Sequence, residues 1–358
     1  MQDSTDTTDS IVADATRRIF VDLCDPQTVN AAPDDGWKIA LWQALEESGL
    51  TLAWVPEEAG GVGASLTDAF AIARISGQFA VPVALGETLL AGMLLAKAGE
   101  EVGAGHMTVA PMRDDAALTI DAQGRVNGRA RHVAYAASAK QIVVIGERDG
   151  RDVIAAVDPA ECRITKRPID LGGERADLTF EAAPTLFHAP APDDFDAAAF
   201  RELGATFRAE QMTGALETML HLASSYAQER VAFGRPIAKF QAVQHNLALL
   251  GTEVAAALTA AGSASETIAN PPDDRKARYL EIASAKIRVG EAVERGSAIA
   301  HQVHGAIGFT AEHILQRFTR RSWGWRDDFG SESTWAVELG NQVIAAGGDA
   351  LWPTLTKR

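Results

Sequence analysis

Side chains suited to phosphate binding gather in one short segment, Arg230–Ala248, with the sequence RVAFGRPIAKFQAVQHNLA. Arg230 ends one helical pattern, and Gly234 and Pro236 interrupt it, because glycine frees the backbone and proline fits only the first turn of a helix. The polar face of the helical pattern that follows carries Gln241, Gln244 and His245. An arginine and amides beside a helix start suit a phosphate-bearing cofactor, because the backbone N–H groups there favour an anion.

Two further motifs occur in the chain. One is QVHGAIGFTAE from Gln302 to Glu312, followed by Arg317, and the other is WVPEEAGGVG from Trp54 to Gly63. Together with the first segment they resemble, in the same order, three motifs of the acyl-CoA dehydrogenase family. The resemblance implies FAD-dependent α,β-dehydrogenation of an acyl-CoA thioester, a reaction of lipid metabolism. In this chemistry a carboxylate removes the α-proton, and the flavin accepts the β-hydrogen as hydride.

In that family the C-terminal helices of one subunit reach an FAD that the neighbouring subunit mainly holds. The resemblance carries this cofactor-binding role onto Arg230, Phe233, Gln241, Gln302 and Gly305, with Ala306 at a place usually filled by Gly or Ser. The half of the FAD site that acts across a subunit boundary is therefore present in this sequence.

The half that a subunit contributes to its own flavin is missing. The family has a threonine-glutamate stretch ending in Gly-Ser-Asp, and later a triplet that begins with a tryptophan lying against the flavin. The matching stretches here are residues 110–119 and 126–135, which lack both the Gly-Ser pair and the tryptophan. His132, Val133 and Ala134 stand where the triplet would be. We interpret the chain as the degenerate subunit of a heteromeric acyl-CoA dehydrogenase. A divergent homo-oligomer that holds FAD through backbone groups is the alternative.

The position of a catalytic base is also altered. One family position, a Glu beside a paired Arg, falls on Gly204 and Ala205 when counted back from the Phe-Gly pair of the first segment. The other, ahead of the final helix, falls near Glu332 and within one residue of Asp328. We take Glu332 and Asp328 as candidate bases, although Glu332 also suits the first turn of a helix with Ser331 as its N-cap.

Helical and β-rich patterns divide the chain into three segments after an acidic tail, residues 1–10, which we predict to be disordered. Residues 11–105 are helical, with helices expected at 11–23, 37–48, 65–79 and 85–98. Residues 106–188 carry short β-rich runs separated by Asp-Gly, Asn-Gly and Gly-Gly turns. Residues 189–358 are helical again, with helices expected at 195–232, 237–268, 273–304 and 332–346. The expected fold is mainly α, with an N-terminal helical domain, a small central β domain and a C-terminal four-helix bundle.

The composition of the chain limits the kinds of partner that we expect it to bind. A net charge of −15 argues against nucleic acid, and the polar N-terminus and the lack of an 18-residue apolar run predict a cytoplasmic protein without a membrane partner.

His301 and His304 lie three residues apart without a supporting carboxylate or cysteine, so no metal site is expected. We expect an acyl-CoA substrate, FAD, and a homo- or hetero-oligomer with a paralogous subunit. A non-catalytic structural partner and a flavin-dependent oxygenase on the same fold remain alternatives.

Overall fold

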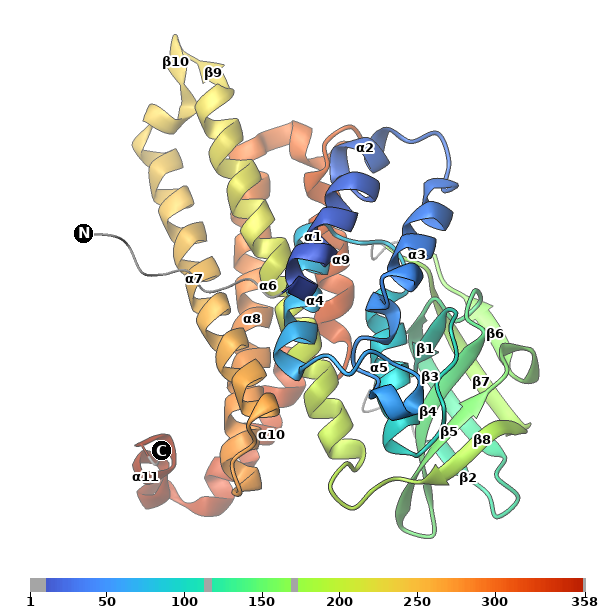
Figure 1. Cartoon of the computed structure of the whole chain (residues 1–358). Coiled ribbons are helices and arrows are strands. Elements are labelled where there is room, and N and C mark those ends of the chain that lie inside the picture. Colours follow the sequence, from blue (N-terminus) through green and yellow to red (C-terminus); the bar gives the residue numbers. More distant parts are fainter. Residues whose placement is uncertain (1–10, 113–117, 169–172, 357–358) are drawn as a thin grey trace. The chain divides into compact units, whose positions relative to one another are not determined.

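The computed structural model describes residues 11–112, 118–168 and 173–356, which form two compact units (Figure 1). The first unit ends at Arg201 and the second begins at Glu202. The predicted disordered tail, residues 1–10, lies outside the described residues. The fold class is confirmed, since helices flank a single β-rich segment in the order expected. The helices and strands before Arg201 belong to one compact unit, so the boundary between residues 105 and 106 stays a prediction.

The helices of the first unit begin at residues that satisfy their free N–H groups. The Ser65 hydroxyl accepts from the backbone N–H of Asp68, and the Asp25 carboxylate accepts from that of Thr28. The helices are α1 (Ile11–Leu23), α2 (Pro26–Ala31), α3 (Trp37–Glu47), α4 (Leu66–Gln78) and α5 (Leu85–Lys97), with short 3-10 turns η1 (Leu50–Leu52) and η2 (Glu57–Ala59). The sequence analysis missed α2 and placed the other four to within one residue at each end.

A twisted, mostly antiparallel sheet completes the first unit. Its strands are β1 (Met107–Val109), β2 (Leu118–Ile120), β3 (Val126–Ala134), β4 (Gln141–Arg148), β5 (Arg151–Val157), β6 (Arg163–Lys166), β7 (Arg175–Ala183) and β8 (Thr185–Pro190), with the 3-10 turn η3 (Pro159–Glu161) between β5 and β6. The order is β6-β7-β3-β2-β4-β5-β8, and β1 pairs in parallel with β4. Small and β-branched residues such as Val126, Val144 and Ala155 fill one core between the strands.

The loop between α3 and α4 folds tightly on itself through one glycine. A Cβ placed on Gly61 would lie 2.0 Å from the carbonyl oxygen of Val55 and 2.4 Å from its Cβ. Val55 is fully buried, and Gly63 donates its N–H to the Val55 carbonyl. Backbone therefore approaches backbone at this point, and only glycine leaves the room.

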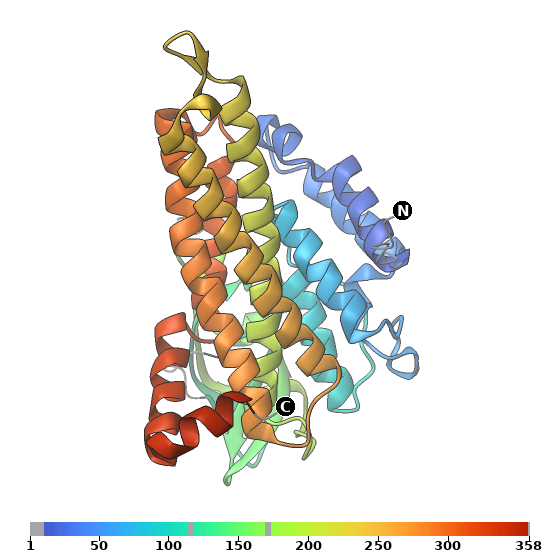
Figure 2. The ribbon, with the colours of Figure 1, turned by 90° about the vertical axis from the view of Figure 1, so that its left-hand side faces the viewer.

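The second unit is built from long, roughly antiparallel helices, of which α6, α7 and α8 lie side by side (Figure 2). The elements are α6 (Ala197–Glu229), which begins just before the boundary, β9 (Val231–Ala232), β10 (Arg235–Pro236), η4 (Ile237–Lys239), α7 (Gln241–Ala269), α8 (Arg275–His304), η5 (Gly305–Phe309), α9 (Leu315–Asp327), α10 (Glu332–Ala346) and α11 (Gly348–Thr356). Helix α7 alone among the described helices is long and apolar enough to span a membrane. Because core helices pass the same test, this is weak evidence.

Three features of the second unit differ from the sequence expectation: the hairpin, helix α9 and helix α11. The Phe-Gly break forms a two-stranded hairpin, β9–β10, and α7 begins only at Gln241, so Pro236 ends a strand instead of opening the helix. Helices α9 and α11 were not predicted; in α9 four arginines make the segment strongly polar on average, although its apolar residues recur with a helical period. Helix α9 packs on α8, where the His301 imidazole contacts the Thr319 hydroxyl at 2.9 Å.

We expect Gly61→Ala to lower the free energy of unfolding by roughly 1–3 kcal/mol, because the new methyl group collides with backbone that has no room to move. Chemical denaturation of the purified chain measures the change. Gly103→Ala is the matched control, since a Cβ there meets nothing within 4 Å. Equal stability of the two variants would show that the loop relaxes without cost.

Candidate functional site

The hairpin β9–β10 projects from one end of the second unit and carries an exposed aromatic side chain at its tip (Figure 2). Phe233 is 96% exposed and has a φ of +51°, followed by Gly234 at +80°. Two successive positive φ values are typical of the tightest hairpin turn, but a phenylalanine there is unusual. The Arg235 guanidinium lies 4.3 Å from the ring centroid of Phe240 and stiffens the hairpin base. The fold therefore holds an apolar ring in solvent on a turn that phenylalanine rarely adopts.

The start of α7 lies beside this hairpin and suits an anion. Arg230 and Gln241 are both exposed, and the N-cap residue Phe240 offers no side chain to the first N–H groups of the helix. Gln244, by contrast, donates its amide to the Ala238 carbonyl at 2.9 Å, which gives it a structural role in the turn. A cation, a free amide and open helix N–H groups are the donor set that a diphosphate requires.

The end of α8 reaches the same end of the second unit. The Tyr226 ring on α6 stacks on the His304 ring at 4.7 Å, and Arg230 donates its N–H to the Tyr226 carbonyl one turn later. Gln302, Gly305 and Ala306 are all exposed there. The six residues predicted to bind the cofactor therefore lie at one end of the unit and face solvent.

A groove of about 870 Å³ runs along α8, η5 and α9, with Gln302 and Gly305 among its lining residues. Phe309 and Trp323 also line it and are 73% and 48% exposed. Its volume lies in the range of cofactor and ligand pockets. The fold thus adds room and apolar surface beside the predicted cofactor residues.

The two histidines of α8 are packing and hydrogen-bonding residues. His304 bonds through Nδ1 to the Ala300 carbonyl at 2.7 Å, and His301 stacks on Phe309 at 4.4 Å. Burial lowers the pKa of both imidazoles, so both are neutral at physiological pH. Among the described residues, no group of three or more His, Cys, Asp or Glu is placed to hold a metal.

In the β segment the described backbone is already bonded within the chain. A bulge in β3 puts His132 at a φ of +56°, where its N–H donates to the Asp177 carboxylate at 3.0 Å and its carbonyl accepts from Arg175 at 2.8 Å. The Ala134 carbonyl accepts from the Thr108 hydroxyl. The His132 N–H and the carbonyls of His132 and Ala134 are therefore already bonded to side chains of this chain. Of the other predicted stretch, residues 113–117 lie outside the described residues.

The candidate base Asp328 belongs to a buried charge cluster. Its side chain is 1% exposed and lies 3.1 Å from the guanidinium of Arg208, which is 2% exposed. Arg208 also donates to the side-chain oxygen of Gln211 at 2.6 Å. A carboxylate held this way has a clear structural role, and its catalytic role stays a prediction.

Lys286 on α8 completes the cluster. Its ammonium donates to the carbonyl oxygens of Arg326 and Asp328 at 2.8 and 2.9 Å, and contacts that of Trp325 at 3.4 Å. These carbonyls close the C-terminal end of α9, where free acceptors favour a cation. Complete burial, opposed in part by the charge of Asp328, lowers the Lys286 pKa to about 7.

The second candidate base, Glu332, opens α10 and pairs with Arg326. The Arg326 guanidinium donates to Oε2 at 2.8 Å and also contacts Oε1. Burial alone would raise the pKa of Glu332, but the hydrogen bonds and charge of Arg326 outweigh it and hold this pKa below its usual range. Ser331 caps the helix as expected, accepting from the N–H of Thr334 at 3.3 Å. Glu332 is thus ionised at neutral pH, and its catalytic role stays a prediction.

Comparison with known proteins identifies the family of the chain. Family models for the N-terminal and C-terminal domains of acyl-CoA dehydrogenases match residues 6–103 and 204–326. The acyl-CoA dehydrogenase IpdE2 of Mycobacterium tuberculosis is 32% identical over 302 residues, which cover 84% of this chain and 86% of that relative. The chain belongs to the acyl-CoA dehydrogenase family. The resemblance of the three motifs is thereby confirmed, and with it membership of an oxidoreductase family.

Solved structures of this family share the fold. The ChsE4-ChsE5 complex of Mycobacterium tuberculosis has a TM-score of 0.83 at 22% identity, covering 97% of this chain and 100% of the matched one. An acyl-CoA dehydrogenase of Bacillus anthracis complexed with FAD has a TM-score of 0.78 at 18% identity, covering 96% of this chain and 69% of the other. At these identities the likeness shows the acyl-CoA dehydrogenase fold alone.

Gly204, one of the two residues on which the sequence analysis places a family base position, is closely packed. A Cβ on Gly204 would lie 2.4 Å from ring atoms of Phe329, which is fully buried. Trp335 donates its indole N–H to the Phe329 carbonyl at 3.0 Å and fixes that loop. A glutamate at residue 204 would therefore require the Phe329 ring to leave.

The sequence analysis missed Arg208, which pairs with the Asp328 carboxylate, and Lys286, which binds the backbone carbonyls beside it; it placed Arg326 in a basic cluster without assigning it to Glu332. Lys286 gives the only available signal, because it interrupts an otherwise apolar face of α8 between Ile282 and Val289. Arg208 lies 120 residues from its partner Asp328 in the sequence. Arg326 lies in a run of mixed charges, and the sequence does not show which carboxylate it binds.

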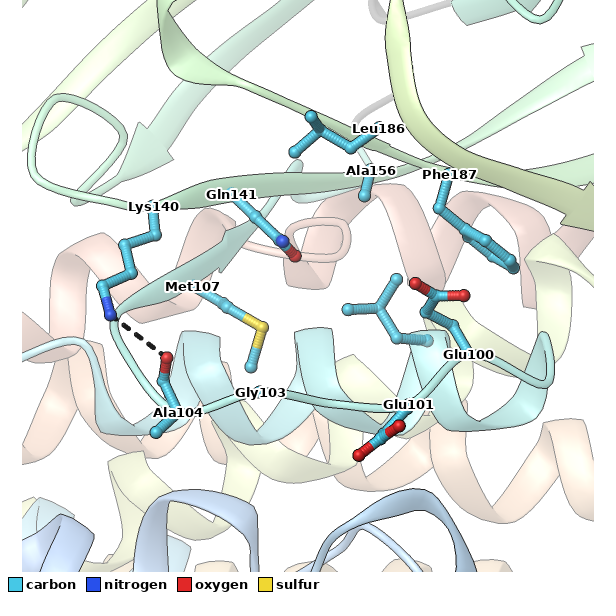
Figure 3. Close-up of a pocket in the computed structure, with 11 residues that line it drawn as sticks. Glu100, Glu101, Gly103, Ala104, Met107, Lys140, Gln141, Ala156, Leu186 and Phe187 are labelled. Atoms are coloured by element: carbon cyan, nitrogen blue, oxygen red, sulfur yellow. Dashed lines mark hydrogen bonds between the residues drawn. The ribbon is translucent and has the colours of Figure 1, made fainter.

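A small cavity in the first unit is too tight for a cofactor (Figure 3). Its volume is about 80 Å³, and Glu100, Met107 and Phe187 are among its lining residues. Lys140 closes one side by donating to the Ala104 carbonyl at 3.2 Å. Ligand pockets start at roughly 300 Å³, so this space suits only solvent.

We expect Lys286→Met to change how stability depends on pH. Between the folded pKa of about 7 and the ordinary value of 10.5, the unfolded chain binds a proton that the folded chain has lost. The wild-type free energy of unfolding should therefore rise relative to the variant by up to about 1.4 kcal/mol per pH unit above pH 7.

Chemical denaturation at several pH values between 7 and 9 measures this difference. Lys276→Met, at an exposed position of the same helix, is the control and should follow the wild type. A constant difference between wild type and Lys286→Met across this range would contradict the lowered pKa.

Proposed function

We propose that this chain is one subunit of a heteromeric acyl-CoA dehydrogenase and acts on an FAD held mainly by a paralogous subunit. The observation that carries the proposal is a split in the cofactor residues. Arg230, Gln302 and Gly305 are exposed at one end of the second unit, whereas the His132 backbone is bonded to the chain's own side chains. The ChsE4-ChsE5 neighbour is a complex of two different chains, which supports this arrangement.

Each exposed residue has a defined task toward the partner's cofactor. The Arg230 guanidinium and the first N–H groups of α7 bind its diphosphate, and the Gln241 and Gln302 amides orient its polar edges. Gly305 leaves space for close approach, since a Cβ there would meet nothing within 4 Å. When bound, FAD accepts the β-hydrogen of an acyl-CoA thioester as hydride.

We place the α-proton base of this reaction in the partner subunit. Asp328 is buried against Arg208, and Arg326 binds both oxygens of Glu332. A carboxylate with a lowered pKa accepts a proton weakly, which makes Glu332 a poor general base as it stands. We further propose a cytoplasmic location, in keeping with the acidic composition.

Purification of the chain alone and with its paralogous partner tests the proposal. We expect the lone chain to lack a stoichiometric flavin spectrum and the co-expressed complex to show one. Anaerobic addition of an acyl-CoA should reduce the flavin of the complex, which separates dehydrogenation from oxygenase chemistry. A lone chain that purifies with one FAD per subunit would overturn the heteromeric arrangement.

We expect Arg230→Ala to weaken FAD binding in the complex by about tenfold or more, because a charge-assisted contact to the diphosphate is worth roughly 1.5–3 kcal/mol. Flavin release on dilution or gel filtration measures the loss. Lys239→Ala removes an exposed cation of the same connection and is the matched control. Equal retention of FAD in both variants would remove Arg230 from the cofactor site.

We expect Glu332→Gln to leave the rate of flavin reduction in the complex within about threefold of wild type. The Glu332 carboxylate is bound by Arg326, so we expect it to take no part in proton transfer. A catalytic base would lose roughly 10²–10⁴-fold. Stopped-flow reduction by acyl-CoA measures the rate. A loss of that size with unchanged folding would restore Glu332 as the base.

A further inference from the structure

The last two helices of the second unit form an arm that the described chain leaves largely uncovered. Trp335 is the last buried residue of α10, and none of the residues from 336 to 356 is buried. We call residues 336–356 the C-terminal arm. Gly347 and Gly348 join α10 to α11 within it, and a Cβ on either glycine would meet nothing within 4 Å. The arm therefore lacks a core of its own.

The exposed side chains of the arm are apolar. Val337 and Ile344 lie seven residues apart, close to two helical turns, so they share one face of α10. Leu351, Trp352 and Leu355 gather on one side of α11 through spacings of one and four residues. All five are exposed, Ile344 to 79% and Trp352 to 73%. Two neighbouring helices thus present large apolar groups to solvent, which is unusual for a surface that stays free.

Helix α11 is too short and too irregular to be stable without cover. It has nine residues, whereas isolated helices shorter than about 12–15 residues are marginal in water. Pro353 lies inside it and lacks the N–H that would bond to the Asp349 carbonyl one turn earlier. A helix of this kind gains its stability from packing of its apolar side. The described chain buries no residue of α11, so the packing surface must come from another molecule.

The arm lies at the end of the second unit away from the predicted cofactor residues. A Cβ on Gly290 would lie 3.0 Å from the Glu332 side chain, and the Tyr279 hydroxyl donates to Glu338 at 2.7 Å. Helix α10 therefore runs back along α8 toward its start, whereas Gln302 lies in the last turn of α8. Figure 1 shows α11 and the β9–β10 hairpin at opposite ends of this unit. A partner that binds only at the Gln302 end leaves the arm uncovered.

Charge favours a second copy of this chain as the occupant. Within the arm only Glu338 and Asp349 are charged, and the chain as a whole has a net charge of −15. Two copies therefore repel one another over most of their surface and approach most easily where charges are fewest. Helices that bind membranes carry cations along their polar face, and here the nearest in sequence, Lys357 and Arg358, follow the arm.

The size of the apolar surface also suits such a contact. Each of the five exposed apolar side chains offers on the order of 100 Å². Together they supply roughly 500 Å² per copy, a large part of the about 800 Å² that each partner buries in a stable complex. An apolar surface with few charges is complementary to itself, which a two-fold symmetric contact requires.

We propose that two copies of this chain associate through their C-terminal arms about a two-fold axis, with Ile344 and Trp352 at the centre of the contact. This contact is separate from the cofactor end, so the chain forms it without FAD and without a paralogous subunit. The inference therefore does not rest on the proposed function. A complex with the paralogous subunit then holds two copies of each chain.

Analytical ultracentrifugation of the purified full-length chain over a series of concentrations tests the proposal. We expect a reversible equilibrium between monomer and dimer. Each substitution occurs twice in a symmetric dimer, so Ile344→Asp and Trp352→Asp should each raise the dissociation constant at least about a hundredfold. Val21→Asp alters an exposed apolar residue of α1 and is the matched control, which should dimerise like the wild type. Circular dichroism checks that all three variants fold.

Three outcomes would overturn the self-association. The first is a chain that stays monomeric at every concentration. The second is a dimer that both arm variants leave unchanged, or that Val21→Asp weakens equally. The third is a monomer whose arm variants alone fail to co-purify with the paralogous subunit, or alone fail to sediment with phosphatidylcholine vesicles, which would assign the arm to that subunit or to lipid.

Discussion

The buried ammonium of Lys286 is the interaction on which the second unit depends most. It closes the end of α9 by binding backbone carbonyls, and the carboxylate of Asp328 beside it binds Arg208 on α6. Three helices distant in sequence are thereby fixed at one point. Removing one member of such a cluster leaves an uncompensated buried charge, which costs about 3–5 kcal/mol. Buried charge and the packing of Phe329 and Trp335 together hold the connection between α9 and α10.

That same connection decides what the subunit contributes chemically. Because the loop is held in place, Phe329 packs against Gly204, and Arg326 binds Glu332 at the start of α10. The positions predicted from the sequence for a catalytic carboxylate are thus filled by the Phe329 ring or engaged in ion pairs. The exposed end of the unit, with Arg230 and Gln302, keeps its polar groups facing solvent. The charged groups inside the second unit are thus paired, whereas those at its exposed end face solvent.

Much of the fold was predictable because the apolar periodicity and the capping residues of a helix can be recognised in the sequence. Helix α1 matched to the residue, and the Ser331 cap of α10 was found from its sequence context. The hairpin at Phe233 was not predicted. Its turn depends on two positive φ values, and phenylalanine is a poor indicator of that conformation. Helix α9 was missed because its buried face includes Arg321 and Ser322, residues that a hydrophobic pattern does not count.

The sequence by itself determined the family and the order of helical and β segments, and it singled out the candidate cofactor residues, because short motifs and periodic patterns are local properties of the chain. Only the tertiary structure decided which charged and backbone groups are bonded to other groups of the chain. Arg208 meets Asp328 across 120 residues, and His132 loses its backbone groups to Arg175 and Asp177 on another strand. Pairing over such separations depends on how helices and strands pack, and a linear pattern carries no record of it.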